Sequence, residues 1–408
     1  MKATNSGHNK SSAKWEEPST HPKVITMLGT LPPIPALSSY CLEMASSLAD
    51  LIAVEFISFK KIYPSFLYPG GGLKNDYTFP KINHPCIKIR RRLKWYNPLT
   101  WIRESFKTRG DLLHAQWWSL PLAPVYLAIS IAYKIKKKPV IFTVHNVFPH
   151  EHSRLHHLVC RFLFKWVDFF IVHAVSNKDK LIRYFSISPE RVSLIPHGPL
   201  DFHVPKNADR NVVRRSLGLL PEQKVVLLFG AIRPYKGIET AIRSFSRVSM
   251  VIPEARLLIA GKLWESWLPY DQLISDLGVG EYIISQLEYI PSNQIYRYFI
   301  ASDLILLPYH DFDSQSGVGA LAVSFRKPMI VTNVGGLPEL QNDGLYVIPP
   351  KDPETLAERI IMCLKDPQKL EEMKKGTEAV ASRISWPKIA AKTLEVYKKV
   401  LILKERNH

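Results

Sequence analysis

The stretch Phe229-Gly-Ala-Ile-Arg-Pro-Tyr-Lys-Gly237 decides the fold of this chain. It follows an apolar run at residues 224–228, typical of a buried parallel strand, and precedes residues 238–245, whose apolar side chains have helical spacing. A strand that ends in a glycine turn before a helix brings free amides and the positive helix end to the turn. With Arg233 and Lys236 beside them, the stretch predicts a phosphate site; the alternative is a surface turn with two solvated cations.

A second segment of the same half favours the phosphate site. Ser314-Gln-Ser-Gly-Val-Gly-Ala-Leu-Ala-Val-Ser-Phe325 predicts a helix entered through Ser316 and Gly317, small residues whose amides a ligand can approach closely. Met329-Ile-Val-Thr332 follows as a short buried strand, and Asn333-Val-Gly-Gly-Leu-Pro-Glu339 as a glycine loop with an acid at its end. This half of the chain therefore has two turns where backbone amides are open to an anion.

These blocks, in this order, resemble the second domain of GT-B glycosyltransferases of family 4, also called glycosyl transferases group 1. In that family the lysine-glycine turn holds a nucleotide diphosphate, and glycine amides with a Glu-x7-Glu element hold the sugar and the ribose. The resemblance spans roughly residues 23–400. It implies transfer of a sugar from a nucleotide diphosphate sugar to a hydroxyl, with retention at the anomeric carbon and without a metal ion or other cofactor.

The chain departs from the family pattern at two places. Ala231 stands where the family often has arginine after the first glycine, so Arg233 is expected to supply that charge. The two acids of Glu-x7-Glu fall on Asp313 and Leu321. Asp313 still accepts hydrogen bonds from sugar hydroxyls. Leu321 cannot accept one from a ribose hydroxyl, so either another group does this or the contact is missing.

The first half offers further candidates at the ends of predicted strands. Thr143-Val-His-Asn146 resembles the family's Thr-x-His element, whose histidine faces the donor sugar and can donate a hydrogen bond without titrating. Ile195-Pro-His-Gly198 resembles the family's tight turn beside the nucleotide, although an ordinary interdomain turn is the alternative. The loop at residues 29–39, which begins with Gly29, is expected to receive the acceptor.

The predicted site residues form two groups. Catalytic roles are predicted for His145, Arg233 and Lys236, because cations on the diphosphate oxygens stabilise the departing charge more in the transition state than in the ground state. Substrate-binding roles are predicted for Gly29, His197, Gly198, Gly230, Asp313, Ser316, Gly317, Val318 and Glu339.

No metal site is predicted, although Asp311-Phe-Asp313 has the Asp-x-Asp pattern by which other glycosyltransferases hold a divalent ion. The pattern is short and common, and it precedes a predicted helix start, where aspartate is a good capping residue. Arg233, Lys236 and the helix amides are expected to replace the metal.

Length and composition fit two domains of a soluble protein. The chain has 408 residues, of which 46% are hydrophobic and 22% charged. Predicted strands alternate with predicted helices in both halves, so the fold class is α/β, with two doubly wound, Rossmann-like domains facing a cleft. The predicted boundaries are a disordered tail at 1–22, a first domain at 23–200, a link at 201–222, a second domain at 223–384 and a helix at 385–408 that crosses back.

Charge and cysteine usage bear on partners and location. The net charge is +18, with local clusters at residues 87–94 and 134–138 that favour an anionic partner or else form solvated faces. Four scattered cysteines suit a reducing cytosol. We find no signal peptide, and the apolar run at 117–133 is short for a membrane span, which needs ~20 residues. We therefore expect a cytoplasmic, peripheral protein at the inner membrane face, with a glycan or lipid-linked glycan acceptor.

Three other functions remain open at this point. A nucleotide-sugar epimerase would share the fold, and Leu321 makes an inactive sugar-binding homologue conceivable. A basic nucleic-acid-binding protein would explain the charge, but the chain has no recognition-helix or zinc-finger pattern. We therefore predict no nucleic-acid partner.

Overall fold

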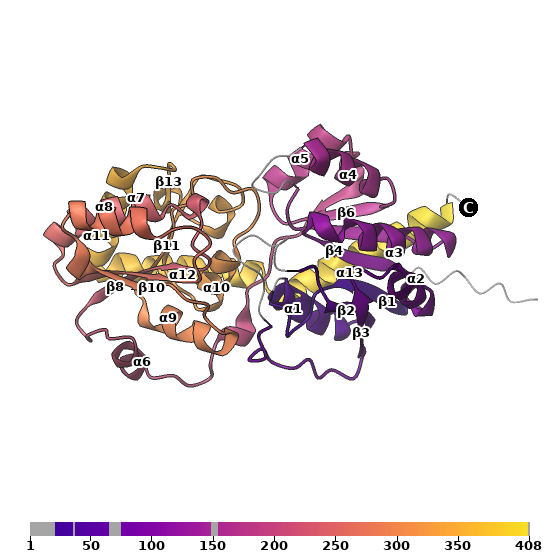
Figure 1. Cartoon of the computed structure of the whole chain (residues 1–408), viewed down its shortest axis with the longest axis horizontal. Coiled ribbons are helices and arrows are strands. Elements are labelled where there is room, and N and C mark those ends of the chain that lie inside the picture. The colour runs from indigo at the N-terminus through magenta and orange to yellow at the C-terminus, as the bar shows by residue number, and fades with distance from the viewer. Residues whose placement is uncertain (1–20, 36, 65–74, 148–153, 407–408) are drawn as a thin grey trace, which may run out of the picture.

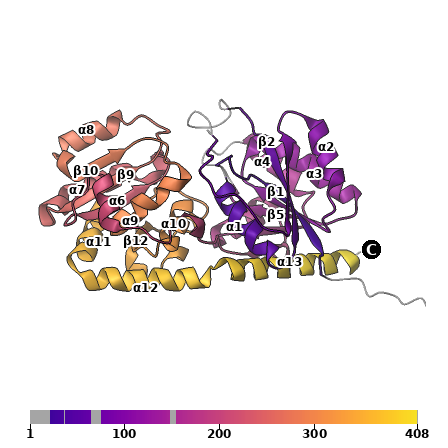
Figure 2. The same ribbon diagram turned by 90° about the horizontal axis from the view of Figure 1, so that it is seen from below.

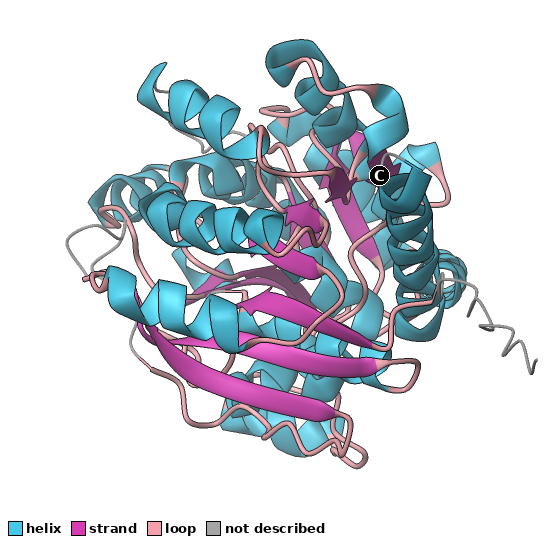
Figure 3. Ribbon diagram, turned by 90° about the vertical axis from the view of Figure 1, so that its right-hand side faces the viewer, coloured by secondary structure: helices cyan, strands magenta, loops and turns pink. Residues whose placement is uncertain are grey.

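The computed structural model describes residues 21–35, 37–64, 75–147 and 154–406, which form two α/β domains side by side (Figure 1). Each domain is built on a parallel sheet with helices packed around it, as Figure 3 shows for the first domain, which faces the viewer there. The predicted fold class is confirmed. The predicted tail at 1–22 lies outside the described residues, apart from 21 and 22.

The described part of the first domain contains seven parallel strands in the order β3-β2-β1-β4-β5-β6-β7. The strands are β1 (Val24–Gly29), β2 (Ala53–Lys61), β3 (Ile87–Lys94), β4 (Leu113–Trp117), β5 (Val140–Val144), β6 (Phe169–Val172) and β7 (Val192–Leu194). The helices are α1 (Ser38–Ala49), α2 (Pro98–Lys107), α3 (Ala123–Ile135), α4 (Arg154–Phe164) and α5 (Val175–Phe185).

The described part of the second domain contains six parallel strands in the order β10-β9-β8-β11-β12-β13. The strands are β8 (Lys224–Phe229), β9 (Ala255–Ala260), β10 (Ile283–Gln286), β11 (Leu304–Leu307), β12 (Met329–Thr332) and β13 (Val347–Ile348). The helices are α6 (Arg210–Ser216), α7 (Ile238–Val251), α8 (Leu268–Asp276), α9 (Ile295–Ala301), α10 (Gly317–Ser324), α11 (Pro353–Lys365) and α12 (Pro367–Arg383). The last helix, α13 (Trp386–Arg406), follows α12 and packs against the first domain.

Both sheets reverse their winding direction beside their first strand. The reversal lies between β1 and β4 in one sheet and between β8 and β11 in the other. At such a point the connections to the two neighbouring strands leave in opposite directions, which opens a crevice at the carboxyl ends of the strands. Gly29 ends β1 and Gly230 directly follows β8, so both predicted glycines lie at the switch point of their sheet.

The last two helices tie the domains together. Figure 2 shows α12 and α13, both in yellow, running along one side of the molecule from the second domain to the first. On the first domain α13 packs against α1, and the Tyr397 hydroxyl lies 2.6 Å from Nδ1 of His114 in β4. α13, which spans Trp386–Arg406, therefore extends from the second domain onto the first.

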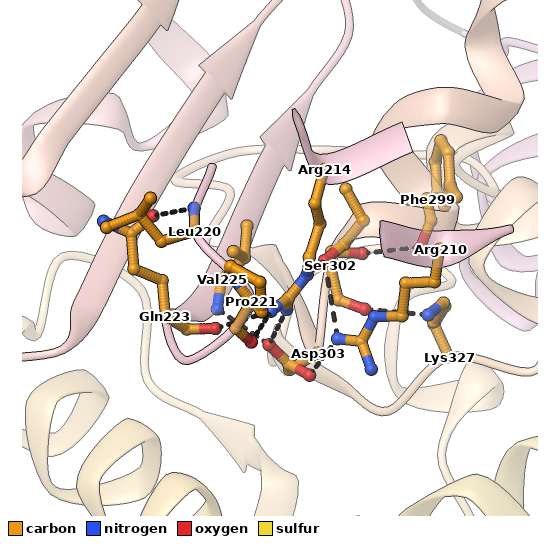
Figure 4. Close-up of polar contacts among 11 residues, drawn as sticks. Arg210, Arg214, Leu220, Pro221, Gln223, Val225, Phe299, Ser302, Asp303 and Lys327 are labelled. Carbon is orange, nitrogen blue, oxygen red and sulfur yellow. Dashed lines mark hydrogen bonds and ion pairs between the residues drawn. The ribbon is translucent and has the colours of Figure 1, made fainter. Parts of the chain in front are cut away.

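The predicted link at 201–222 contains a helix, α6, which is fastened to the second domain (Figure 4). The buried guanidinium of Arg214 donates to Asp303 at 2.8 Å, to the Ala301 carbonyl at 3.0 Å and to the carbonyls of Pro221 and Gln223 at 2.8 and 2.9 Å. One side chain therefore satisfies several carbonyls where the chain enters β8, and α6 belongs structurally to the second domain.

Candidate active site

The turn after β8 has a backbone that requires glycine at both ends. Gly230 has a φ of +100° and Gly237 a φ of +70°, a region that residues with a side chain rarely adopt. A Cβ on Gly237 would lie 1.8 Å from the carbonyl oxygen of Pro308, and one on Gly230 would lie 3.1 Å from Cγ2 of Val318. The turn is therefore pressed against the chain after β11 and against the first turn of α10.

Lys236 lies inside this turn with its ammonium group buried. Nζ donates a hydrogen bond of 2.5 Å to the Tyr309 hydroxyl, and among the described residues it has no carboxylate partner. Burial, and secondarily the nearby Arg233 cation, lower the pKa of Lys236 to about 7. A buried amine without a counter-ion is destabilised in its charged form, so an anion at this place would be bound strongly.

The start of α10 is connected to the same lysine through the Tyr309 hydroxyl. The Ser316 hydroxyl accepts from the Gly319 amide at 3.2 Å and lies 3.0 Å from the Tyr309 hydroxyl that holds Lys236. A Cβ on Gly317 would meet nothing within 4 Å, so space is open at this helix end. The predicted residues Gly230, Lys236, Ser316, Gly317 and Val318 are therefore brought together. Tyr309, which connects them, was missed because a tyrosine after a buried strand resembles ordinary core.

Arg233 belongs to the same turn, and an aromatic ring holds its side chain. The guanidinium carbon lies 3.5 Å from the centre of the Trp264 ring, a cation–π contact. Its Nε is buried and has no hydrogen-bond partner among the described residues. A guanidinium held flat in this way presents its N–H groups in a fixed plane, as bidentate binding of a phosphate requires.

His145 follows β5 and belongs to a cluster of buried imidazoles in the first domain. Its Nε2 lies 3.0 Å from Oε1 of Gln116, and its Nδ1 lies 3.2 Å from Nε2 of His173. The ring of Tyr40 packs against His145, His173 and His197, with ring centres 4.7, 5.2 and 4.9 Å apart. A substrate hydroxyl would have to displace Gln116 to reach the His145 ring.

The imidazole cluster is electrically neutral near pH 7. Burial lowers the pKa of His173 to about 3 and that of His197 to about 4, and lowers the pKa of His145 well below its ordinary value. Neutral rings next to one another avoid the repulsion that imidazolium ions would suffer here. Any role of His145 is therefore that of a neutral hydrogen-bonding group. Gln116, on β4, and His173, directly after β6, were not predicted from the sequence.

The turn at His197 and Gly198 joins three parts of the chain. The His197 amide donates to Oε1 of Gln315 at 2.6 Å. A Cβ on Gly198 would lie 2.5 Å from the ring of Trp386, whose Nε1 donates to the Pro199 carbonyl at 2.6 Å. Packing against the start of α13 thus accounts for this glycine, whether or not a nucleotide also approaches it.

Asp313 and Glu339 contact the first domain. Asp313 forms an ion pair with Lys180 on α5, and its carbonyl accepts from the Ser176 hydroxyl at 3.2 Å. Glu339 accepts from the Val175 amide at 3.1 Å, and burial raises its pKa. These two carboxylates were predicted to bind substrate. The structure shows them joining the domains at the start of α5.

Two positions singled out in the sequence remain, Gly29 in the first domain and Leu321 in the second. Gly29 leads into a loop whose Pro33 carbonyl accepts from the Asp76 amide at 2.7 Å, and Asp76 in turn accepts from the Tyr289 hydroxyl and the Ser292 amide, each at 2.8 Å. The loop after Gly29 is thereby linked to the second domain. Leu321 is buried in α10 as part of the core, so it does not face a ribose.

Two family models match successive parts of the chain. The model described as Glycosyl transferases group 1 matches residues 209–380, and the model described as Glycosyltransferase Family 4 matches residues 37–199. The chain belongs to the family 4-like glycosyltransferases with the GT-B fold. The resemblance seen in the sequence is confirmed for both domains of this glycosyltransferase, including the first, whose motifs are the less specific ones.

Curated relatives and solved structures agree with this assignment. This glycosyltransferase is 28% identical to a D-inositol 3-phosphate glycosyltransferase of Segniliparus rotundus over 57% of the chain and 53% of the relative. It is 25% identical to one of Thermobispora bispora over 74% and 72%. The match thus spans only about half the length of the first of these relatives.

Among solved structures, Anabaena HepE in complex with UDP-glucose has a TM-score of 0.69 with 18% identity, over 92% of this chain and all of that one. A sucrose-phosphate synthase from Thermosynechococcus elongatus has a TM-score of 0.69 with 18% identity, over 93% and all of the respective chains. At such low identity these two structures establish the shared fold of this glycosyltransferase and nothing finer.

Proposed function

We propose that this glycosyltransferase moves a hexose from a nucleotide diphosphate sugar to a hydroxyl of a glycan or lipid-linked glycan. The observation that carries the proposal is the buried, uncompensated ammonium of Lys236 between a glycine turn and the first turn of α10. A diphosphate there would receive one buried cation, the flat guanidinium of Arg233 and amides at a helix end. Uridine nucleotides are the first donors to test, because HepE was solved with UDP and UDP-glucose.

The proposed reaction proceeds on one face of the sugar. The bond between the anomeric carbon and the diphosphate oxygen breaks, and the acceptor oxygen bonds to the same face of that carbon. The acceptor proton passes to an oxygen of the departing diphosphate, so configuration is retained and no enzyme nucleophile is needed. Asp313 and Glu339 are engaged with Lys180 and the Val175 amide, which supports a route without a covalent intermediate.

The decisive experiment for the proposed function is a screen of nucleotide sugars against the purified protein, read by donor hydrolysis and by thermal protection. A donor at 100 times its Kd should stabilise the fold by about 2.7 kcal/mol. Hydrolysis without isomerisation of the donor separates a transferase from an epimerase. If no nucleotide sugar is hydrolysed or protects the fold, the proposal is wrong.

We further propose that the protein acts at the cytoplasmic face of an anionic membrane. Its net charge of +18 supports this proposal, since basic residues near such a surface contribute about 1 kcal/mol each. Among the residues that the structure describes, no helix has the length and apolarity to cross a bilayer. Peripheral binding would place the acceptor side within reach of a lipid-linked substrate.

Donor hydrolysis is expected to continue in excess chelator, because Lys236, Arg233 and helix amides are proposed to neutralise the diphosphate in place of a divalent ion. The measurement is turnover with and without EDTA after dialysis. Loss of turnover that manganese or magnesium restores would contradict a metal-free mechanism. Asp311 and Asp313 would then be the candidate metal ligands.

Donor affinity is expected to fall as pH rises above about 7. Below its pKa of about 7 the Lys236 amine is charged and ready for the diphosphate, whereas above it binding must be accompanied by proton uptake. The dissociation constant should therefore rise up to about tenfold per pH unit above that pKa. Titration calorimetry from pH 6 to 9 measures this slope. Lys236→Ala should bind more weakly with no such slope, and a wild-type affinity that is flat with pH would contradict the prediction.

A further inference from the structure

A basic hollow lies on the outer edge of the first domain, where β3 meets the end of α2. Its volume is about 580 Å³. A cluster of positive charge was predicted here, but strand β3 was not. Residues 87–90 do alternate Ile, Lys, Ile and Arg, as in an edge strand. The hollow is lined by Glu55, Lys88, Ile89, Arg90, Arg91, Arg92, Lys107 and Arg109.

The floor of the hollow is a fixed arrangement. Nε of Arg90 donates to Glu104 at 2.9 Å, and its Nη1 lies 3.5 Å from Glu55. The side chains of both acids are almost wholly buried, at 2% and 7% exposure. Glu55 also accepts from the Arg109 amide at 2.8 Å. Both carboxylates are therefore committed to one guanidinium and one amide, and Arg90 is held in place.

The other cations of the hollow lack such partners. Among the described residues, Lys88, Arg91, Arg92, Lys107 and Arg109 form no ion pair. Six cations thus surround two carboxylates that are already engaged. The mutual repulsion of these cations is relieved when an anion enters, and a phosphate with several oxygens can accept from more than one of them.

The second basic cluster, at residues 134–138, behaves differently. Lys134 forms an ion pair of 2.5 Å with Asp168. Lys136 donates to the Thr108 carbonyl at 3.1 Å, and Lys138 to the Gly110 carbonyl at 2.6 Å, so these lysines secure the chain after α2. Lys134, Lys136 and Lys138 therefore stabilise the fold. Of the two basic clusters, the one at the hollow has cations without ion-pair partners among the described residues.

The hollow is separate from the proposed donor site. Lys88 is in register with Glu55 near the start of parallel strands, and Arg109 precedes β4, so the hollow lies toward the amino ends of the strands. The donor turn lies at the carboxyl end of β8 in the other domain. An anion in the hollow would therefore not compete with the nucleotide.

We propose that this hollow binds a phosphate group of a second ligand, either a soluble phosphate ester or a phospholipid headgroup. The headgroup source is supported by α2, which borders the hollow through Lys107 and exposes Leu99, Ile102 and Phe106 with helical spacing. Apolar side chains beside a cationic hollow match the two layers of a membrane interface. The proposal does not depend on the proposed transferase reaction.

The test uses the double variant Arg91→Gln/Lys107→Gln and the matched control Lys365→Gln/Lys375→Gln, which removes the same charge from exposed positions of the second domain. Binding of inorganic phosphate and pyrophosphate is measured by calorimetry in a Lys236→Ala background, so that the proposed donor site does not contribute. Sedimentation measures binding to vesicles of neutral lipid and to vesicles of neutral lipid with about 30% phosphatidylglycerol. Both measurements are made at about physiological ionic strength.

We expect the hollow variant to lose at least about tenfold in affinity for phosphate, for anionic vesicles or for both, while the control stays within about twofold of the parent. Loss for vesicles alone identifies a headgroup as the ligand, and loss for free phosphate identifies a soluble ester. If the hollow variant and the control bind both probes equally, the proposal is overturned. Donor hydrolysis, followed in parallel without the Lys236→Ala change, reports on the proposed function separately.

Discussion

Lys236→Ala is expected to lower turnover by about 10²–10³-fold, a loss of about 2.7–4 kcal/mol of transition-state stabilisation. The reason is the place of the ammonium group, which is buried, held by the Tyr309 hydroxyl at 2.5 Å and unpaired with any described carboxylate. Charge develops on the diphosphate as the sugar leaves, so a cation in a low-dielectric position acts most strongly at that moment. Turnover of the best donor from the screen measures the effect.

The matched control for this variant is Lys375→Ala, an exposed lysine on α12 in the same domain. It removes an equal charge from the protein without touching the turn after β8. Its turnover should equal that of the wild type. Turnover of Lys236→Ala within threefold of the wild type would remove this lysine from the mechanism and leave Arg233 to carry the diphosphate alone.

Trp386→Ala is expected to lower the free energy of unfolding by about 3–5 kcal/mol, the usual cost of removing a large aromatic side chain from a core. The indole packs against Tyr40 with ring centres 5.4 Å apart, fills the space beside Gly198, and donates to the Pro199 carbonyl at 2.6 Å. It stands where α13 leaves the second domain, so its loss affects the contact between the two domains. Urea unfolding followed by fluorescence and circular dichroism measures the change.

Two further variants sharpen that experiment. Trp386→Phe keeps an aromatic ring but leaves the Pro199 carbonyl without its donor, and should cost about 1–3 kcal/mol. Leu403→Ala, an exposed position on the same helix, should change stability by no more than about 0.5 kcal/mol. Equal stability of Trp386→Ala and Leu403→Ala would show that the junction is held by other contacts.

Local signals predicted the elements around the turn after β8 correctly. The apolar run before Gly230, the turn with Lys236 and the small residues Ser316 and Gly317 all lie within short stretches of sequence. A strand, a glycine turn and a helix start are each set by neighbouring residues, and parallel strands then bring their carboxyl ends to one edge. That is why Gly230, Lys236 and the start of α10 could be grouped before the structure was known.

Long-range contacts escaped the sequence analysis for the opposite reason. Gln116 lies on β4, and His145 and His173 directly follow β5 and β6, so their contacts depend on how the sheet orders those three strands. Strand β3 was not predicted because it carries many cations. An edge strand tolerates such cations, but in the sequence a run of cations is typical of a solvated surface. The roles of Asp313 and Glu339 were predicted from their positions in sequence motifs. Such a position does not show that these residues also contact the first domain.

By itself the sequence determined two doubly wound domains, a glycine turn with one lysine at its centre, and a basic first half. These follow from short-range periodicity, from glycines and from charge. Only the tertiary structure decided that Asp313 pairs with Lys180, that Lys134, Lys136 and Lys138 contact Asp168 and the chain after α2, and that residues 88–92 line an open hollow. Those outcomes depend on which charges meet across elements far apart in the chain, because a short stretch of sequence does not specify the partner that the fold brings to a charged side chain.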